Sequence, residues 1–189
     1  MLRDEFITSD THFDHANVIK YSNRPFADVD EMNEELIRRW NAKVPPTAVI
    51  YHLGDFCFGN ANRIRELVGR LHGRIRMFPG NHDKLLVKNK KLHELFEWCR
   101  PFSFHESKVP NGPKIVMCHY AFDVWNKHHH GAWMLHGHSH GSLPRGGRVR
   151  MDVGVDCHPN YEPFSFPEIE EQLSKLQPAV LDHHGKPRD

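Results

Sequence analysis

The first half of this 189-residue chain alternates short apolar runs with longer segments whose apolar residues have helical spacing. Segment 28–43 places apolar residues on one side of a helix, with Asp28 or Asp30 as N-cap and Pro45-Pro46 after its end. A second helical segment is predicted at 60–70, and a third at 84–98 with a break near Asn89. The apolar runs between them predict strands at 5–9, 48–53 and 74–78.

The second half has a different pattern, in which strands follow one another. Apolar runs predict strands at 101–106, 114–118, 132–135 and 149–155, and a closing helix at 167–176. Early alternation and later clustering of strands predict an α/β fold whose sheets contain both parallel and antiparallel strands. No repeat or linker interrupts the chain, so we expect one domain over residues 1–189.

Net charge and hydropathy argue against a dedicated nucleic-acid-binding protein and against a membrane protein. The 25 basic and 24 acidic residues leave a net charge of +1, which gives no strong nucleic-acid signal. No apolar run approaches the roughly 20 residues that span a bilayer, and a strand begins too close to Met1 for a signal peptide. The four cysteines form no CxxC pair, which is typical of reduced thiols. We therefore expect a cytoplasmic protein without a membrane partner.

Almost every predicted strand ends in a run of Asp, His or Asn side chains. The runs are SDTH, LGD, PGNHD, CHY and HGHSH. Ligand sites in α/β sheets gather at the carboxyl ends of strands, so five such runs predict one shared site. In an extended backbone the i, i+2 spacing of Asp10 and His12 points both side chains to one face, and the same holds for His138 and His140.

The residue types in these runs are those of a metal site. A lone DxH, GD or HxH is common, whereas GNHD after a strand is more informative because a turn requires Gly-Asn but not His-Asp. Three oxygen ligands and four imidazoles suit Mn, Fe or Zn, and they are too many for one tetrahedral ion. They suit two ions that share a carboxylate. The seven residues are Asp10, His12, Asp55, Asn81, His119, His138 and His140.

Taken in order, these residues resemble the motif series of the calcineurin-like metallophosphoesterases. The motifs are Asp10-x-His12, Gly54-Asp55, Gly80-Asn81-His82-Asp83, His119 and Gly137-His138-x-His140. The resemblance implies a four-layer α/β/β/α sandwich with mixed sheets and a dimetal site at the carboxyl ends of strands. It implies two divalent ions, with Mn favoured and Fe or Zn as alternatives. One ion would be held by Asp10, His12, Asp55 and His140; Asp55 would bridge to a second, held by Asn81, His119 and His138.

The resemblance also implies a metal-dependent phosphoesterase and assigns two catalytic residues. His82 would contact the substrate phosphate and protonate the leaving oxygen. Asp83 would hydrogen-bond His82 and fix its tautomer. A hydroxide bridging the two metals would attack phosphorus.

Two differences from the motifs of protein phosphatases bear on the substrate class. The residues after Gly54-Asp55 contain no Arg of the GDxxDRG type, and GNHD replaces GNHE, which argues against a protein phosphatase. Residues 10–26 resemble small bacterial and phage phosphoesterases without a cap domain. These features favour a phosphodiesterase acting on small phosphodiesters or nucleotides. The alternatives are a phosphomonoesterase or nucleotide pyrophosphohydrolase, with a nuclease or a non-catalytic metal-binding scaffold less favoured.

Further polar residues have two readings each. His15 and Asn17 follow His12 and would either line the pocket or lie at a helix cap or surface position. Arg24 would either bind a substrate phosphate as a bidentate donor or form a structural salt bridge. Residues 128–130, three consecutive histidines, would form a solvated loop or edge the site.

Overall fold

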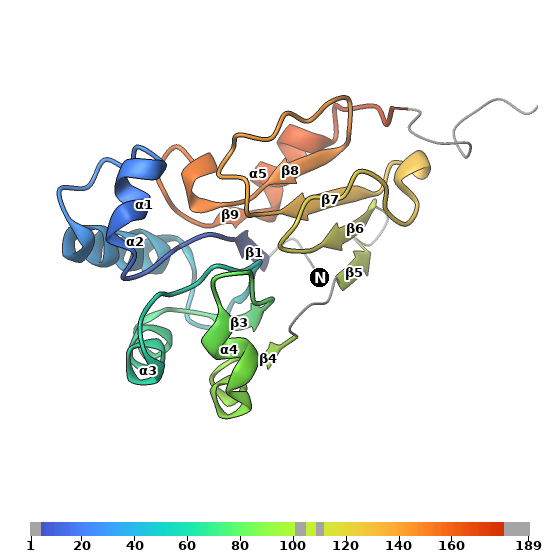
Figure 1. The fold of residues 1–189 in the computed structure, drawn as a ribbon. Coiled ribbons are helices and arrows are strands. Elements are labelled where there is room, and N and C mark those ends of the chain that lie inside the picture. The colour runs from blue at the N-terminus through green and yellow to red at the C-terminus, as the bar shows by residue number, and fades with distance from the viewer. Residues whose placement is uncertain (1–4, 101–104, 109–111, 180–189) are drawn as a thin grey trace, which may run out of the picture.

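Two β-sheets form the framework of the computed structural model, which describes residues 5–100, 105–108 and 112–179. The first sheet has the strand order β4-β3-β2-β1-β9, and the second has the order β5-β6-β7-β8 (Figure 1). The first sheet comprises β1 (Glu5–Thr8), β2 (Val49–His52), β3 (Arg74–Met77), β4 (Trp98–Cys99) and β9 (Phe164–Ser165). The second comprises β5 (His105–Lys108), β6 (Lys114–Met117), β7 (Trp133–His136) and β8 (Arg150–Asp152).

Both sheets are mixed, as the sequence predicts. Strands β1 to β4 run parallel to their neighbours, whereas β9 is antiparallel to β1. In the second sheet β6, β7 and β8 are parallel and β5 is antiparallel to β6. The α/β class with parallel and antiparallel strands is therefore confirmed.

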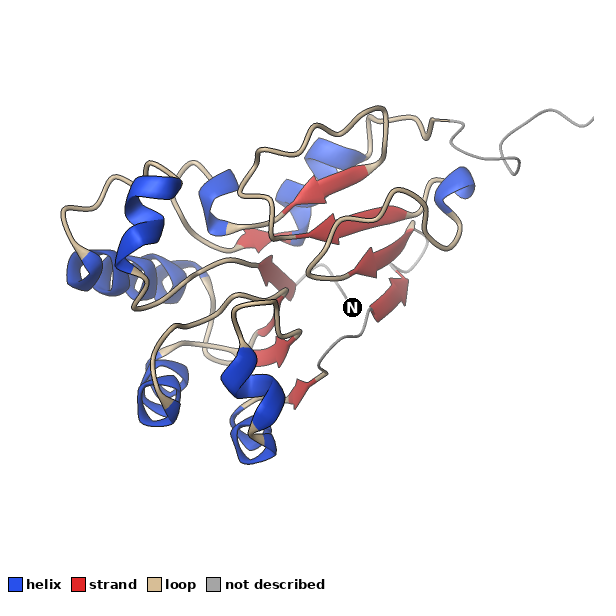
Figure 2. Ribbon diagram, in the orientation of Figure 1, coloured by secondary structure: helices blue, strands red, loops and turns tan. Residues whose placement is uncertain are grey.

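Helices cover one face of the first sheet (Figure 2). The structure contains α1 (Ala16–Tyr21), α2 (Val29–Lys43), α3 (Ala61–Arg70), α4 (Lys84–Lys88) and α5 (Phe166–Leu173). Short 3-10 helices are η2 (Lys90–Leu95), η3 (His128–His130) and η4 (Val155–Cys157). The carboxylate of Asp28 accepts hydrogen bonds from the first turn of α2, and Asn60 caps α3 in the same way. None of the helices in the described ranges is long and apolar enough to cross a bilayer.

Alternating residues of the strands divide the core into separate clusters. Ile50 and Ile75 point from the first sheet toward Trp40 and other apolar residues of the helices. Their neighbours on the opposite face, such as Tyr51, pack in a second cluster with Met117 of the second sheet. The two sheets therefore face each other across this second cluster, which α5 also joins through Phe166, Ile169 and Leu173. The outer face of the second sheet is covered by the segment around Trp125 and η3.

Several boundaries differ from those predicted. The helix expected at 84–98 is broken at Asn89 as anticipated, but the part after the break is the 3-10 helix η2, and Trp98 already begins β4. The strand expected at 149–155 ends at Asp152, because that carboxylate accepts hydrogen bonds from the backbone N–H groups of Gly141 and Gly154 and turns the chain into η4. The strand expected at 101–106 lies partly outside the described residues, and β5 is described from His105. The short elements α1 and β9 were not predicted.

Candidate metal centre

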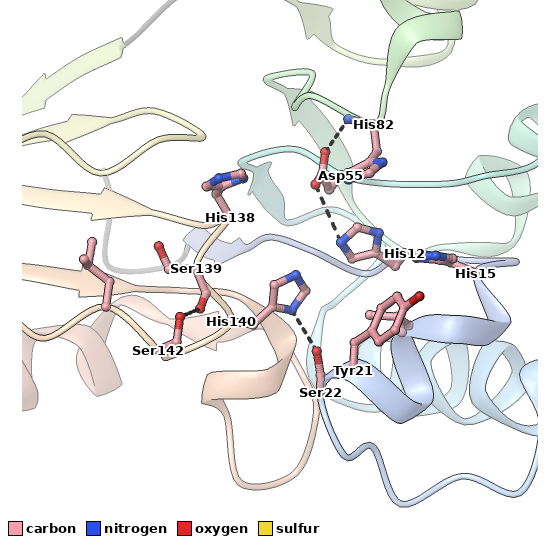
Figure 3. Close-up of a pocket in the computed structure, with 12 residues that line it drawn as sticks. His12, His15, Tyr21, Ser22, Asp55, His82, His138, Ser139, His140 and Ser142 are labelled. Carbon is pink, nitrogen blue, oxygen red and sulfur yellow. Dashed lines mark hydrogen bonds and ion pairs between the residues drawn. The ribbon is translucent and has the colours of Figure 1, made fainter.

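The seven predicted ligands lie beyond the carboxyl ends of five strands. Figure 3 shows four of them, His12, Asp55, His138 and His140, around one pocket. Asp10 and His12 follow β1, Asp55 follows β2, Asn81 follows β3, His119 follows β6, and His138 and His140 follow β7. The loops are joined by backbone hydrogen bonds from Asp10 N to Gly54 O and from Gly137 N to His119 O. The strand ends thus bring the predicted residues together.

These residues form two groups with the composition of metal sites. Asp10, His12 and His140 offer ligand atoms that all lie within 4.8 Å of one another. Asp55, His119 and His138 form a second group with the same property. Each group contains one carboxylate and two imidazoles, and both could hold a metal ion.

Asp55 lies between the two groups. Its Oδ2 atom is 3.6 Å from Nε2 of His12 in the first group and 3.7 Å from Nε2 of His119 in the second. The amide oxygen of Asn81 lies 3.0 Å from the same nitrogen of His119. A single carboxylate oxygen therefore faces ligand atoms on both sides, with an amide oxygen beside the second group.

Two of the imidazoles are oriented through their Nδ1 atoms. Nδ1 of His119 lies 2.8 Å from the carbonyl oxygen of Leu53, and Nδ1 of His140 lies 2.6 Å from Oδ2 of Asp156. An imidazole that donates through Nδ1 presents an unprotonated Nε2, which is the form that binds a metal. The carbonyl oxygen of Leu53 and the carboxylate of Asp156 thereby favour the tautomer in which Nε2 is free to bind a metal.

The burial of unpaired polar atoms fits bound cations. Asp10 is 0% exposed, and its Oδ1 atom has no hydrogen-bond partner among the described residues. Both ring nitrogens of His12 are likewise buried without a partner. Burial raises the pKa of Asp10 well above its usual range and lowers that of His12. Because buried unpaired polar atoms are costly, these atoms have the character of ligands that divalent ions would satisfy.

The backbone of four predicted ligands is left-handed. This corrects the prediction that Asp10 and His12, and likewise His138 and His140, point to one face because they lie on an extended strand. Asp10 and His12 have φ of 56° and 50°, and His138 and His140 have φ of 68° and 46°. The i, i+2 pairs therefore do not converge because they lie on an extended strand. They do so in tight turns of sparsely populated backbone conformation, which proteins keep mainly at functional sites.

Glycines let these turns approach one another. A Cβ on Gly54, whose φ is +109°, would lie 2.6 Å from Nδ1 of His119. A Cβ on Gly80 would overlap Oδ1 of Asp55 and lie 2.6 Å from Cε1 of His119. Glycine is required here because backbone and ligand side chains occupy adjacent space.

Gly80→Ala is expected to weaken Mn binding at least about tenfold, because the added methyl group displaces Asp55 and His119. Calorimetric titration with Mn measures the affinity. Gly69→Ala is the matched control, since a Cβ there meets nothing within 4 Å and the position lies inside α3. The control should bind Mn normally and be more stable by about 0.5–1 kcal/mol. Equal Mn affinity in both variants would contradict the requirement for glycine at position 80.

His82 is exposed and lines the pocket above the two groups. Its backbone N–H donates to Oδ1 of Asp55 at 2.9 Å, which leaves Oδ2 facing the ligand nitrogens. Its ring centroid lies 5.5 Å from that of His12 and 4.9 Å from that of Phe58. The imidazole is therefore accessible to a molecule in the pocket.

Asp83 does not occupy the position expected of it. Its buried carboxylate accepts hydrogen bonds from the backbone N–H groups of Asp55, Phe56 and Gly80 at 2.6, 2.9 and 2.8 Å. No hydrogen bond joins it to His82 in the part of the chain that the structure describes. Burial raises the pKa of Asp83 to about 7, although the three amide donors oppose the rise. The expected orientation of His82 is corrected: Asp83 points inward and fastens the Asp55 loop to the Gly80 turn.

Arg24 also differs from the substrate-binding expectation. Its guanidinium is buried and donates to both oxygens of Asp156 at 2.7 and 2.8 Å. It further donates to the carbonyl oxygens of Asp10 and Thr11 at 2.7 and 2.9 Å. Arg24 is absent from the pocket lining, so the structural salt bridge that was the alternative is the arrangement found.

Of the remaining candidate residues, only His15 lines the pocket. His15 lines the pocket, whereas Asn17 is exposed on α1 and does not. His128 of η3 is buried beside Trp125, and none of the three consecutive histidines lines the pocket.

Asp156 was not predicted as part of the site. Its position directly after the predicted strand at 149–155 was the signal in the sequence that could have indicated it.

A third group, formed by His158, Glu162 and Glu168, has ligand spacing but already surrounds a cation. Nζ of Lys43 lies 3.0 Å from Glu162 and 2.7 Å from Glu168. The ammonium occupies the centre that an ion would take. This cluster therefore joins α2 to the start of α5 and is not a candidate metal site.

The Lys43 cluster is expected to stabilise the fold less at acid pH. Although burial acts to raise it, hydrogen bonds from Lys43 and Ser165 lower the pKa of Glu168 to about 2. A carboxyl whose pKa is lowered by folding stabilises above its unfolded value of 4.5, and the contribution is lost as the pH falls toward 2. Urea unfolding of the wild type and Glu168→Gln should differ by at most about 1 kcal/mol at pH 7, because solvent screens the pair. The difference should vanish near pH 2; a constant difference would contradict the assignment.

The fold and the site define a two-sheet α/β protein with histidine–aspartate groups able to hold metal ions. The chain belongs to the family of the uncharacterized protein MJ1445 of Methanocaldococcus jannaschii, to which it is 34% identical over 181 residues, covering 92% of this chain and 93% of that protein. The gene 66 protein of Mycobacterium phage L5 is 23% identical, over 82% of this chain and 88% of its own length. No family model matches the sequence.

A solved structure has the same fold. The crystal structure of the protein of unknown function AQ665 from Aquifex aeolicus matches with a TM-score of 0.65 and 24% sequence identity. The match covers 89% of this chain and 98% of that one. It shows that the two-sheet architecture is shared.

Proposed function

We propose that this protein is a binuclear-metal-dependent phosphoester hydrolase of the calcineurin-like metallophosphoesterase type, acting on small phosphodiesters or nucleotides. The observation that carries the proposal is the position of Asp55, whose single Oδ2 atom faces His12 in one ligand group and His119 in the other. A carboxylate between two such groups is the arrangement that two metal ions in a hydrolytic site require. The exposed imidazole of His82 supports a hydrolytic function, because it is available as a proton donor.

The four-layer sandwich belongs to the same proposal. Two facing sheets, with α2 and α3 on the outer face of the first, supply three of its layers. The fourth would be supplied by the segment around Trp125 and η3, which packs on the outer face of the second sheet.

The proposed ligands divide into two sets with one shared member. One ion would be held by Asp10, His12, Asp55 and His140, and the other by Asp55, Asn81, His119 and His138. Oxygen and imidazole donors suit Mn, with Fe or Zn as alternatives. When bound, two such ions lower the pKa of a coordinated water and neutralise charge on the phosphoryl oxygens.

The chain's own contribution to the reaction is proton transfer. His82 is solvent-accessible in the pocket and its backbone is fixed by Oδ1 of Asp55, so its imidazole can reach a phosphoester held at the ligand groups. Protonated His82 would give its proton to the leaving alkoxide oxygen as the P–O bond breaks. The buried His12 and His119 belong to the proposed ligand sets, and burial lowers the pKa of each, which favours the unprotonated form that binds a metal.

Hydrolysis of two chromogenic esters by the Mn-loaded protein tests the proposal. Bis-p-nitrophenyl phosphate is expected to be hydrolysed with a higher kcat/KM than p-nitrophenyl phosphate. The reverse preference would replace the diesterase with a phosphomonoesterase on the same metals. Metal binding without hydrolysis of either ester would identify a non-catalytic metal-binding scaffold. The chelator-treated protein is the control for metal dependence.

A further inference from the structure

The pocket at the metal centre is lined by neither Lys nor Arg among the described residues. Its volume is about 700 Å³, and its basic side chains are five histidines. Phosphate groups outside a metal site are usually bound by Arg, Lys or helix N-termini. A pyrophosphate chain or a nucleic-acid strand would bring further negative charge that no Lys or Arg of this lining would meet. The lining therefore fits a substrate with one phosphoryl group.

Exposed apolar side chains gather around this pocket. Among the described residues, the large exposed apolar side chains are Tyr21, Phe58, Tyr120, Val124 and Leu143. Tyr21 is 76% exposed and Leu143 is 40% exposed, and both line the pocket. Phe58, 43% exposed, packs directly on the pocket residue His15. Isolated exposed apolar residues are ordinary, but a group beside a candidate active site indicates contact with a ligand.

Three rings form an aromatic wall beside the pocket: Tyr21 and His15 line it, and Phe58 packs on His15. The rings of His15 and Phe58 are stacked, with centroids 3.8 Å apart and an angle of 11° between their planes. Tyr21 lies edge-on to His15 at 6.4 Å. Figure 3 shows His15 and Tyr21 together beside His12, on the side away from His138. The wall of Tyr21, His15 and Phe58 adjoins His82, whose ring is 4.9 Å from that of Phe58.

We infer that the substrate is a phosphodiester with one phosphoryl group and a nucleobase on one of its two ester groups, and that the base stacks on the wall of Tyr21, His15 and Phe58. This inference rests on the proposed hydrolytic function and names its substrate class. Every nucleobase has an aromatic face, and stacking on Tyr or Phe requires no particular base. The wall therefore selects for a nucleoside without selecting its identity.

Two diesters with the same leaving group test the inference. Thymidine 5′-(p-nitrophenyl) phosphate and methyl p-nitrophenyl phosphate both release p-nitrophenolate, and they differ in the presence of a nucleoside. The Mn-loaded wild type should favour the thymidine ester by about tenfold in kcat/KM, which is the strength of one base–aromatic stack. Tyr21→Ala and Phe58→Ala should each lower this ratio about fivefold. Tyr21→Phe keeps the aromatic face and should keep the ratio.

Other outcomes overturn the inference or the function separately. Equal hydrolysis of both esters by the wild type would overturn the nucleobase and leave the phosphodiesterase. Loss of the ratio in Tyr120→Ala instead of Tyr21→Ala would place the base on the opposite side, next to His138, and overturn the wall. If neither ester is hydrolysed, calorimetric binding of thymidine 5′-monophosphate and methyl phosphate decides. Tighter binding of the nucleotide that is lost in Tyr21→Ala supports the inference, and equal binding overturns it.

Discussion

Replacing His82 with alanine is expected to lower hydrolysis of an alkyl phosphodiester by about 100-fold to 10,000-fold while the protein keeps its metal. The imidazole is exposed in the pocket and belongs to neither ligand group, so its removal takes away the proposed proton donor and no candidate ligand atom. The loss should be smaller for a p-nitrophenyl ester, because a stable leaving anion departs without a proton. Comparing both esters in the wild type and His82→Ala measures this dependence on the leaving group.

Asp55→Ala is the contrasting variant. It removes the oxygen that faces both His12 and His119, so metal analysis of the purified protein should show loss of metal together with turnover. His15→Ala removes another pocket imidazole, one that stacks on Phe58, and should not show the same dependence on the leaving group. If His82→Ala is purified without metal, the role given to His82 is wrong.

The elements that sequence analysis located well are those with local determinants. The start of α2 follows from Asp28, whose carboxylate accepts from N–H groups two and three residues ahead. The start of α3 follows from Asn60 in the same way. The meeting of the candidate ligands within each sheet was predictable because parallel strands place their carboxyl ends at one edge. Local patterns thus predicted the fold class and the gathering of these residues at strand ends, whereas their division into two groups came from the family resemblance.

The errors arose where a side chain has partners far away in the sequence. Asp83 was expected to serve its neighbour His82, but its carboxylate is satisfied by amides of the Asp55 loop, 27 and 28 residues earlier. Arg24 pairs with Asp156 across 132 residues. Neither partner can be inferred from spacing, because spacing describes one element at a time. The left-handed backbone at Asp10 was not predicted either, and its N–H and C=O groups are bonded to Gly54 and Arg24, which are distant in the sequence.

Arg24 and Asp156 are expected to control metal affinity through the position of His140. Asp156 accepts hydrogen bonds from Nε and Nη2 of Arg24 and from Nδ1 of His140, the last at 2.6 Å. Although burial acts to raise it, hydrogen bonds from His140 and Arg24 lower the pKa of Asp156, so it stays an anion. The guanidinium also holds the carbonyl oxygen of the ligand residue Asp10. One buried ion pair thus touches two members of the same ligand group.

Asp156→Asn should weaken Mn binding about 10-fold to 100-fold, because the amide holds the His140 tautomer less firmly than a carboxylate. It should also destabilise the metal-free protein by about 3–5 kcal/mol, since Arg24 is left as an unpaired buried charge. Stability is measured by urea unfolding without metal, and affinity by calorimetry under conditions where the variant is folded. The loss of affinity is expected to appear in folded protein.

A double variant separates positioning from simple stability. Arg24→Met combined with Asp156→Asn removes both charges, so unfolding should require more free energy than in Asp156→Asn alone. The Mn affinity should stay low, because His140 still lacks its carboxylate acceptor. Recovery of affinity together with stability would show that the pair acts only by holding the fold. Recovery of stability without affinity would show that a buried carboxylate, 16 residues beyond His140, sets the orientation of a metal ligand.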